Sequence, residues 1–303
     1  MVQSDKRMTR ENRYNLLFRS VVLACAVLSV FITGGIILSL ILNTFSFFGE
    51  VSLFEFFTGS EWTPLFANPS YGILPLISGT LIVTLCAAAI ALPFGLFSAV
   101  YLSEYAKPRT RKVLKPVIEV LAGVPSIVYG YFALNTITPL LQRLIPSTQI
   151  YNAASAGIAM GIMIMPLVCS LSEDALSAVP LGIRYGGIAL GVTKYEYVKG
   201  IAIPYAFSGI VAAFVLAISR AIGETMIVAI AAGARPTLTL NPLVSVQTLT
   251  AFIAQASQGD NPHGTTPYYA LYAVGLLLFI ITFFMNTIAH RTIRRVKQSM
   301  GAL

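Results

Sequence analysis

The sequence predicts an all-α membrane protein with six transmembrane helices, and three observations support this class. Only 11% of the 303 residues are charged, whereas roughly a quarter of the residues are charged in soluble domains. Hydrophobic residues make up 56% of the chain, and the mean hydropathy is +0.78. Six stretches also have the length, about 20 apolar residues, that a helix needs to cross the hydrocarbon core of a bilayer.

The spans follow one another along residues 21–290. A tail, residues 1–20, precedes the first span, whose apolar run is too long for the apolar region of a signal peptide, so we expect the run to be retained. The other five follow from apolar length. Residues 291–303 form a second tail. In order, the predicted spans are Val21–Leu42, Leu76–Leu102, Val120–Leu141, Ala153–Leu171, Tyr205–Ala232 and Tyr268–Ala289.

The basic residues predict the orientation. If both tails are cytoplasmic, every Lys and Arg lies on the inner side except Arg143 and Arg235, which are outside, and Arg220, which is within the fifth span. This is the usual bias of membrane proteins, and it explains the net charge of +8 without nucleic-acid binding. Residues 43–75 and 233–267 are then outer loops, in which Trp62 lies at the lipid interface or meets an external partner. Residues 172–204 are the longest inner loop.

The inner loop has a helical pattern with three breakpoints. Pro180 can open a helix, Gly191 can break it, and Pro204 can begin the next span. We therefore expect two short helices with a glycine turn between them. Such a projection can insert into a soluble partner, although an ordinary interfacial loop is the alternative.

The fifth span contains two opposite charges, Arg220 and Glu224, which would share one face of a helix because they are four residues apart. A charge at the centre of a span costs about 2.5–3.5 kcal/mol on insertion scales, so such residues face protein or water. One interpretation is a self-neutralising ion pair that locks helix packing. The other, which we favour, is that Arg220 offers its planar set of donors to an oxyanion that crosses the membrane.

In that interpretation Glu224 adjusts the affinity and the selectivity. It partly neutralises Arg220, so that the anion is not held too tightly. Its carboxylate can also accept a hydrogen bond from an oxyanion that still carries a proton. Phosphate carries one or two protons near neutral pH and sulfate carries none, so the pair is expected to favour phosphate.

The chain is not expected to bind a cofactor or to be an enzyme. Cys25, Cys86 and Cys169 lie in apolar runs without a CxxC partner, and no His is near a carboxylate or Cys cluster, so we expect no disulfide framework and no metal site. The string nearest to a Walker A motif, "GDNPHGTT", has Thr265 where the lysine is needed. Magnesium and ATP would therefore be bound by a separate ATPase subunit.

The inner loop resembles the cytoplasmic EAA loop of ABC-transporter permeases. Gly191, Ile201 and Pro204 match the spacing of the glycine, isoleucine and proline of that loop. The likeness departs at the EAA triplet, where this chain has Tyr185, Gly186 and Gly187. The resemblance implies that these six residues belong to a coupling helix region that docks on the ATPase.

Two further strings resemble signatures of the phosphate, or Pst-type, ABC permeases: "RAIGETM" at Arg220–Met226 and "EVLAGVPSIVYG" at Glu119–Gly130. The likeness runs from about residue 70 to residue 290, and the stretch "YGILPLISGTLIVTLCAAAIALPFGLFSAVYLSEYA" favours the PstC type over the sister PstA type. It implies a MetI-like type I importer permease in the bacterial inner membrane. The implied partners are a PstA-type permease, two ATPase subunits, a periplasmic phosphate-binding protein and membrane lipid.

The resemblance also implies a set of path residues. Arg220 and Glu224 carry over directly, and Ser126, Tyr129 and Thr225 are added to them. In the third span, Gly123 and Pro125 either free backbone groups that line an ion path or reflect the frequency of Gly and Pro in membrane helices. Glu119 either pairs with Lys115 or forms part of an inner gate.

Three other functions are alternatives: a passive channel, which would not need the inner loop, a membrane enzyme, and a permease for another oxyanion such as sulfate, molybdate or phosphonate.

Overall fold

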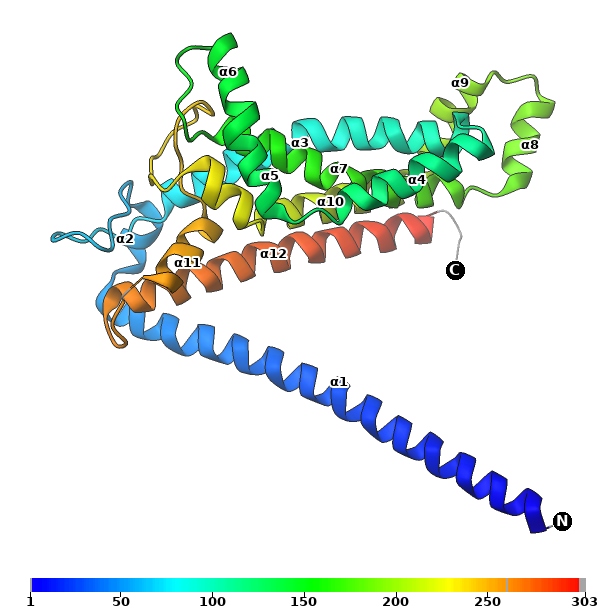
Figure 1. Cartoon of the computed structure of the whole chain (residues 1–303), viewed down its shortest axis with the longest axis horizontal. Coiled ribbons are helices and arrows are strands. Elements are labelled where there is room, and N and C mark those ends of the chain that lie inside the picture. The colour runs from blue at the N-terminus through cyan, green and yellow to red at the C-terminus, as the bar shows by residue number, and fades with distance from the viewer. Residues whose placement is uncertain (1, 260, 300–303) are drawn as a thin grey trace.

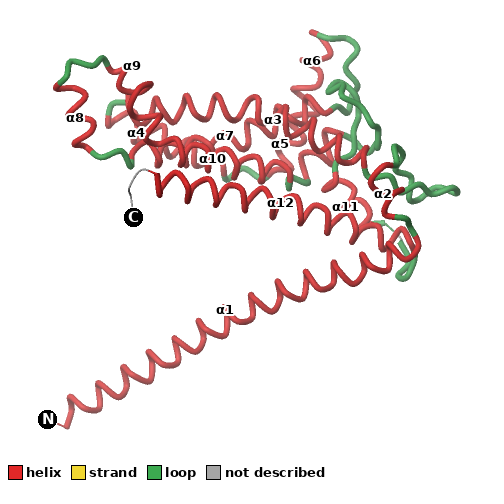
Figure 2. Tube along the Cα trace, turned by 180° about the vertical axis from the view of Figure 1, so that it is seen from behind, coloured by secondary structure: helices red, strands yellow, loops and turns green. Residues whose placement is uncertain are grey.

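The computed structural model describes residues 2–259 and 261–299, and the regular structure in these ranges is helical apart from one isolated bridge between Trp62 and Tyr71. The prediction of an all-α fold is confirmed. The long helices except the N-terminal one lie along a common bundle, and the loops gather at its two ends (Figures 1 and 2). Met1 and residues 300–303 of the predicted tails lie outside the described ranges.

The helices have the following bounds. They are α1 Val2–Glu50, α2 Leu53–Thr58, α3 Leu74–Val100, α4 Pro108–Ala122, α5 Ser126–Phe132, α6 Thr138–Leu144, α7 Ala153–Ser177, α8 Leu181–Ala189, α9 Lys194–Tyr197, α10 Ile203–Ile222, α11 Leu249–Gln258 and α12 Thr266–Ser299. Four π-helical turns, η1 Tyr101–Tyr105, η2 Ala133–Ile137, η3 Val198–Ala202 and η4 Val228–Ala232, continue or join them.

Five described helical runs are long and apolar enough to cross a membrane, and a bent pair gives a sixth when its two halves are counted as one span. The five are Asn15–Glu50, Leu74–Tyr105, Ala153–Ser177, Lys194–Ile222 and Thr266–Ile288. The pair Pro108–Ala122 and Ser126–Leu144 meets at 87°. The predicted third span, Val120–Leu141, is interrupted at Gly123–Pro125, as the sequence indicated, and its first half begins earlier, at Pro108. Pro125 explains the bend, because proline lacks an N–H group and disfavours helical backbone at the residue before it.

The centre of the bundle is made of closely packed helices with small residues at their contacts. Helix α3 packs along α7, and α10 packs on α7 and α12. At Gly161 a Cβ atom would lie 2.9 Å from the carbonyl oxygen of Ala87. Ala87, Ala91 and Ala159 are fully buried at the same contact. Small residues let helix backbones approach closely in membranes, where van der Waals packing drives association.

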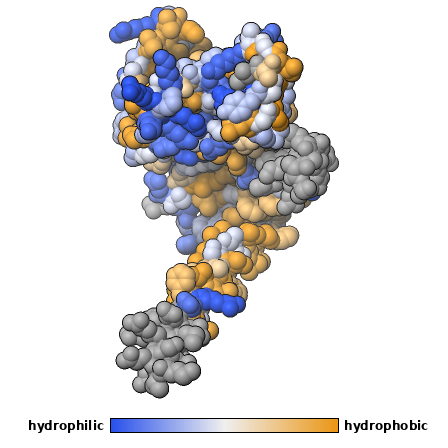
Figure 3. Space-filling view, turned by 90° about the vertical axis from the view of Figure 1, so that its right-hand side faces the viewer, coloured by the Kyte–Doolittle hydropathy of each residue, from blue (hydrophilic) through white to orange (hydrophobic). Residues whose placement is uncertain are grey.

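Helix α1 is arranged differently from the rest. It packs on α12 at the end that leads into α2 and then diverges from the bundle (Figure 1). None of the residues in its most apolar stretch is buried. Its surface is correspondingly hydrophobic, whereas hydrophilic residues gather at the end of the bundle that carries α8 and α9 (Figure 3). This polar end carries the loop predicted to lie on the inner side, and we call it the inner end.

The outer end is more structured than a pair of loops. Helix α1 runs on to Glu50, and both α2 and α11 lie in segments predicted as loops. Trp62 is buried, and its ring meets that of Phe252 edge to face, with 4.9 Å between ring centres. The prediction that Trp62 lies at the lipid interface or meets an external partner is therefore wrong. Its indole instead helps to join the outer segment to α11.

Candidate translocation site and coupling loop

Arg220 and Glu224 do not lie on one continuous helix, contrary to the prediction. Helix α10 ends at Ile222 with Gly223 as its C-cap, and Glu224 and Thr225 are not helical. Helical structure resumes at Met226. Glycine makes this break inexpensive because it is a poor helix former. Among the described residues, Arg220 and Glu224 form no ion pair with each other. The interpretation of a self-neutralising ion pair that locks helix packing is therefore wrong.

Glu224 instead caps the second half of the broken span. One carboxylate oxygen, Oε1, accepts the backbone N–H groups of Met226 at 3.1 Å and Ile227 at 3.4 Å. A negative charge is favourable at a helix N-terminus, where backbone N–H groups lack partners. No described residue donates a hydrogen bond to the other oxygen, Oε2. Glu224 therefore stabilises the break and still has one acceptor available.

Arg220 lies in the last turn of α10 with its side chain exposed. A cation is favourable at this end of a helix because of the helix dipole. Among the described residues, none forms an ion pair or a side-chain hydrogen bond with its guanidinium. Within the described part of the chain the donors of Arg220 therefore have no partner, and the exposed side chain can reach a group outside this chain.

A group of buried threonines supports Glu224 from two other helices. Thr250 of α11 donates a hydrogen bond to the backbone carbonyl of Glu224 at 2.7 Å. Thr80 of α3 accepts the N–H of Leu249 at 3.0 Å. Thr84 and Thr248 line the same small polar space. The N-terminus of α11 is thereby bonded both to α3 and to the break in the fifth span.

The sequence reasoning missed α11 and Thr250 because residues 233–267 are rich in loop-forming types. A signal was nevertheless present. Thr248 is the N-cap of α11, and its hydroxyl accepts the N–H of Ala251 at 3.1 Å. A threonine directly before an apolar run such as Leu249–Ile253 is a helix-start pattern.

The break in the third span lies beside the break in the fifth. Helix α5 packs on η4, and a Cβ atom at Gly130 would lie 3.1 Å from Ile230. The hydroxyl of Tyr129 donates to the carbonyl of Leu121 at 2.9 Å, which satisfies a carbonyl at the end of α4. Tyr129 is buried, so its hydroxyl joins the two halves of the span and is not free for an ion.

Two other predicted path residues flank the breaks. Ser126 is the first residue of α5 and is half-buried. Thr225 is also half-buried, and its hydroxyl donates to the carbonyl of Gly223 at 3.4 Å. Both residues therefore lie at the start of a half-helix, where backbone N–H groups point toward the break.

The inner loop folds as predicted into two short helices around a glycine turn. Gly191 has a φ of +76° between α8 and α9, a backbone conformation that glycine adopts without steric cost. Thr193 then starts α9 with a capping box formed with Glu196. Tyr185 and Gly186 are exposed on α8, whereas Gly187 is buried.

Pro204 lies in the first turn of α10, as predicted, although the helical run is continuous from Lys194 to Ile222. The π-helical turn η3, which contains Ile201, directly precedes it. Local π-helical adjustment lets a membrane helix accommodate proline.

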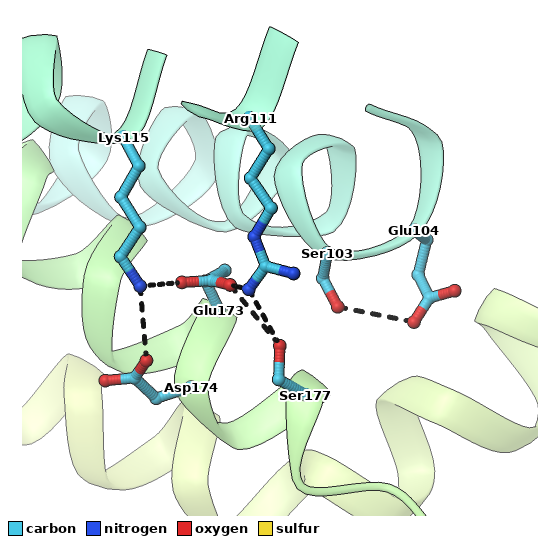
Figure 4. A network of polar contacts seen from close by, with 7 residues as sticks. All are labelled: Ser103, Glu104, Arg111, Lys115, Glu173, Asp174 and Ser177. Atoms are coloured by element: carbon cyan, nitrogen blue, oxygen red, sulfur yellow. Dashed lines mark hydrogen bonds and ion pairs between the residues drawn. The ribbon is translucent and has the colours of Figure 1, made fainter. Parts of the chain in front are cut away.

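Four ionised groups meet where the inner loop joins the bundle (Figure 4). Glu173 of α7 is bonded by Arg111 of α4 and, at 2.7 Å, by Lys115. Lys115 also lies 3.7 Å from Asp174. Lys115 thus pairs with α7 and not with the exposed Glu119, so that alternative for Glu119 is wrong. Nearby, Arg184 of α8 pairs with the buried Glu104 at 2.9 Å.

These features define a class of protein: a polytopic helical membrane component with two interrupted spans and a projecting polar loop. The sequence comparison gives the family. Residues 91–298 match the family described as "Binding-protein-dependent transport system inner membrane component", and the chain belongs to this family. The resemblance seen in the sequence is confirmed at this level.

Relatives and solved structures agree with the family. The chain is 33% identical to the "Probable ABC transporter permease protein YqgH" of Bacillus subtilis, over 95% of this chain and 94% of the relative. It is 30% identical to the "Phosphate transport system permease protein PstC" of Mesorhizobium japonicum, over 98% and 95%. An inward-facing structure of the MetNI methionine ABC transporter matches with a TM-score of 0.55 and 18% identity, over 74% and 94% of the chains. The last match supports the MetI-like permease fold.

Proposed function

We propose that this chain is the permease subunit of an ATP-driven importer of inorganic phosphate. The observation that carries the proposal is the break at Gly223–Thr225, which presents an unpaired guanidinium and a carboxylate with one free oxygen within a membrane span. Full-length similarity to permeases named for phosphate transport supports the same substrate.

The two side chains have complementary roles toward phosphate. The guanidinium of Arg220 donates to two oxygens of the anion at once, which a planar set of donors does well. Oε2 of Glu224 accepts a hydrogen bond from the P–OH group. An oxyanion without a proton, such as sulfate, meets only repulsion from that oxygen. Ser126 and Thr225 add donors at the half-helix N-termini, where partial positive charge favours anions.

The exposed position of Arg220 implies that a second chain closes the path. We assign that role to a PstA-type permease, with a periplasmic phosphate-binding protein delivering the ion to the outer end. Both tails are then cytoplasmic, in the inner membrane of a bacterium. Two ATPase subunits carry the magnesium and ATP, and one of them docks on the inner loop of this chain, where Tyr185 and Gly186 are exposed.

Transport in proteoliposomes that contain the chain with its partners tests the substrate path. Arg220→Gln is expected to abolish ATP-dependent uptake of labelled phosphate while the complex still assembles. Arg235→Gln, an exposed arginine of the outer loop, is the matched control and is expected to transport normally. Excess sulfate or molybdate should not compete. Uptake retained by Arg220→Gln, or competition by sulfate, would refute this path, and uptake without ATP would indicate a passive channel.

A substitution in the turn of the inner loop tests the docking role. Gly191→Val places a β-branched side chain at a φ of +76°, which such residues rarely adopt. Hydrolysis by the ATPase should no longer drive uptake. If hydrolysis and uptake both persist at wild-type rates, the loop does not couple the two.

A further inference from the structure

The ionised groups where α4 meets α7 are not used by the proposed path, and their central carboxylate is too buried for ordinary surface pairs. We call Arg111, Lys115 and Glu173 the inner clamp (Figure 4). The side chain of Glu173 is only 1% exposed, whereas those of Arg111 and Lys115 are 41% and 34% exposed. The carboxylate is therefore the central group, and the two cations reach it from the solvent side.

Every oxygen of Glu173 is engaged. Oε1 receives Arg111 and, at 3.3 Å, the hydroxyl of Ser177. Oε2 receives Lys115 at 2.7 Å. A buried carboxylate needs such partners, since removing one partner of a buried pair is far more costly than removing a surface pair. The last turns of α7 and the middle of α4 therefore move together.

On the side of Glu173, the inner clamp is connected to the inner loop through the end of α7. Helix α7 ends at Ser177 and α8 begins at Leu181, so three residues join them. A segment that short spans about 10 Å even when fully extended. Helix α8 is also held from its own side, because Arg184 pairs with Glu104 at 2.9 Å. A displacement of α8 is consequently passed to the end of α7 rather than absorbed by slack chain.

On the side of Arg111 and Lys115, the inner clamp is connected through α4 to the break in the third span. Helix α4 has 15 residues from Pro108 to Ala122, which corresponds to about 22 Å of helix. It ends at Gly123, directly before the 87° bend. Across the bend, α5 carries Tyr129, whose hydroxyl is bonded to Leu121 of α4. A movement of α4 therefore changes the geometry of the break itself.

We infer that Glu173 is a positioning residue that transmits the movement of the inner loop, through α4, to the break at Gly123–Pro125. The inference rests on the proposed function, in which an ATPase moves the inner loop. Glu173 touches no substrate. Its effect is to keep the ATPase side and the membrane path moving as one unit.

Asp174 offers a matched control. It is the next residue along α7, carries the same charge, and lies 3.7 Å from Lys115, but its side chain is 64% exposed. Glu173→Gln and Asp174→Asn make the same chemical change at neighbouring positions. A general effect of inner-face charge would alter both variants equally, whereas transmission through the clamp alters only Glu173→Gln.

The first measurement is the number of phosphate ions taken up per ATP hydrolysed in proteoliposomes. Glu173→Gln is expected to lower this ratio at least tenfold while hydrolysis continues, and Asp174→Asn should stay within twofold of wild type. Lys115→Gln, at a more exposed position, should also lower the ratio and decides the matter if Glu173→Gln does not assemble. An unchanged ratio in these clamp variants, or a proportional fall in both rates, would overturn the inference.

The second measurement follows the break directly. Spin labels at Val117 of α4 and Val128 of α5, both about half exposed, report the distance across the bend in a background without native cysteines. The distance should change on ATP binding in the wild type and stay fixed in Glu173→Gln. An ATP-dependent change that persists in Glu173→Gln would refute the linkage. A wild-type complex that hydrolyses ATP without moving phosphate would instead refute the proposed function.

Discussion

The third and fifth spans are both interrupted, but they solve the same physical problem in different ways. A broken helix in a membrane leaves backbone N–H and C=O groups without partners, and each unsatisfied group is costly there. In the third span an uncharged hydroxyl, that of Tyr129, satisfies the carbonyl of Leu121. In the fifth, the charged side chain of Glu224 caps Met226 and Ile227.

The two breaks also connect to opposite ends of the molecule. The third span leads through α4 to the inner clamp and the inner loop. The fifth is bonded through Thr250 to α11, which belongs to the outer segment. The break in the third span is thus connected to the end proposed to meet the ATPase, and the break in the fifth to the end proposed to receive substrate. These two connections suit alternating access, which needs a gate sensitive to each side of the membrane.

Among the variants that test this contrast between the breaks, the largest effect is expected from Glu224→Gln, which tests whether the fifth span needs a charge or only a cap. The amide oxygen of glutamine can still accept the N–H groups of Met226 and Ile227, so the fold should be retained. Loss of a hydrogen bond to a charged group costs about 1.5–3 kcal/mol. Uptake of phosphate should therefore fall roughly ten- to a hundredfold, measured at equal amounts of assembled complex. Normal uptake would mean that Glu224 is a cap only.

Tyr129→Phe tests the hydrogen bond with which an uncharged hydroxyl satisfies the backbone at the break in the third span. It leaves the carbonyl of Leu121 without its partner, at a cost of about 1–3 kcal/mol. We expect a lower thermal unfolding midpoint in detergent and a modest loss of uptake. Phe132→Leu, an exposed position on the same helix, is the control and should unfold like the wild type. A large loss of uptake without loss of stability would place Tyr129 in the ion path.

Thr250→Val should have a smaller effect on the fifth span. It removes the donor to the carbonyl of Glu224 while keeping the shape of the side chain. A neutral hydrogen bond contributes about 0.5–1.5 kcal/mol, so uptake should fall roughly two- to tenfold. Thr250→Ser keeps the hydroxyl and should restore most of the activity. Equal activity in both variants would show that α11 does not hold the break.

The smallest effect is expected at Glu119, the acidic residue nearest to the break in the third span. Its side chain is exposed and pairs with no described residue. Glu119→Gln should leave uptake within twofold of wild type. A tenfold loss would identify Glu119 as an inner gate, and the contrast between a charged and an uncharged break would no longer hold.

The sequence predicted the parts of the fold that depend on composition and spacing. Apolar length located the spans, and Pro180 and Gly191 marked the two helices of the inner loop. The interruption at Gly223 was missed, because the residues around it are apolar enough to extend a helix. The ion-pair partners of Glu173 could not be predicted from the sequence either, since Arg111 and Lys115 are about sixty residues away along the chain. Such pairs depend on how α4 and α7 pack, which local pattern does not contain.

The divergence of α1 from the bundle has a mechanical consequence. The helical run Asn15–Glu50 has 36 residues, or about 54 Å of helix, against a hydrocarbon thickness of ~30 Å. A helix of that length extends beyond the hydrocarbon core, and its tilt adjusts the apolar stretch to the thickness of the surrounding bilayer. Helix α1 is anchored to the rest of the chain by the aromatic cluster around Phe47, at its C-terminal end. In a thicker membrane α1 would tilt less from the bilayer normal, and in a thinner membrane it would tilt more.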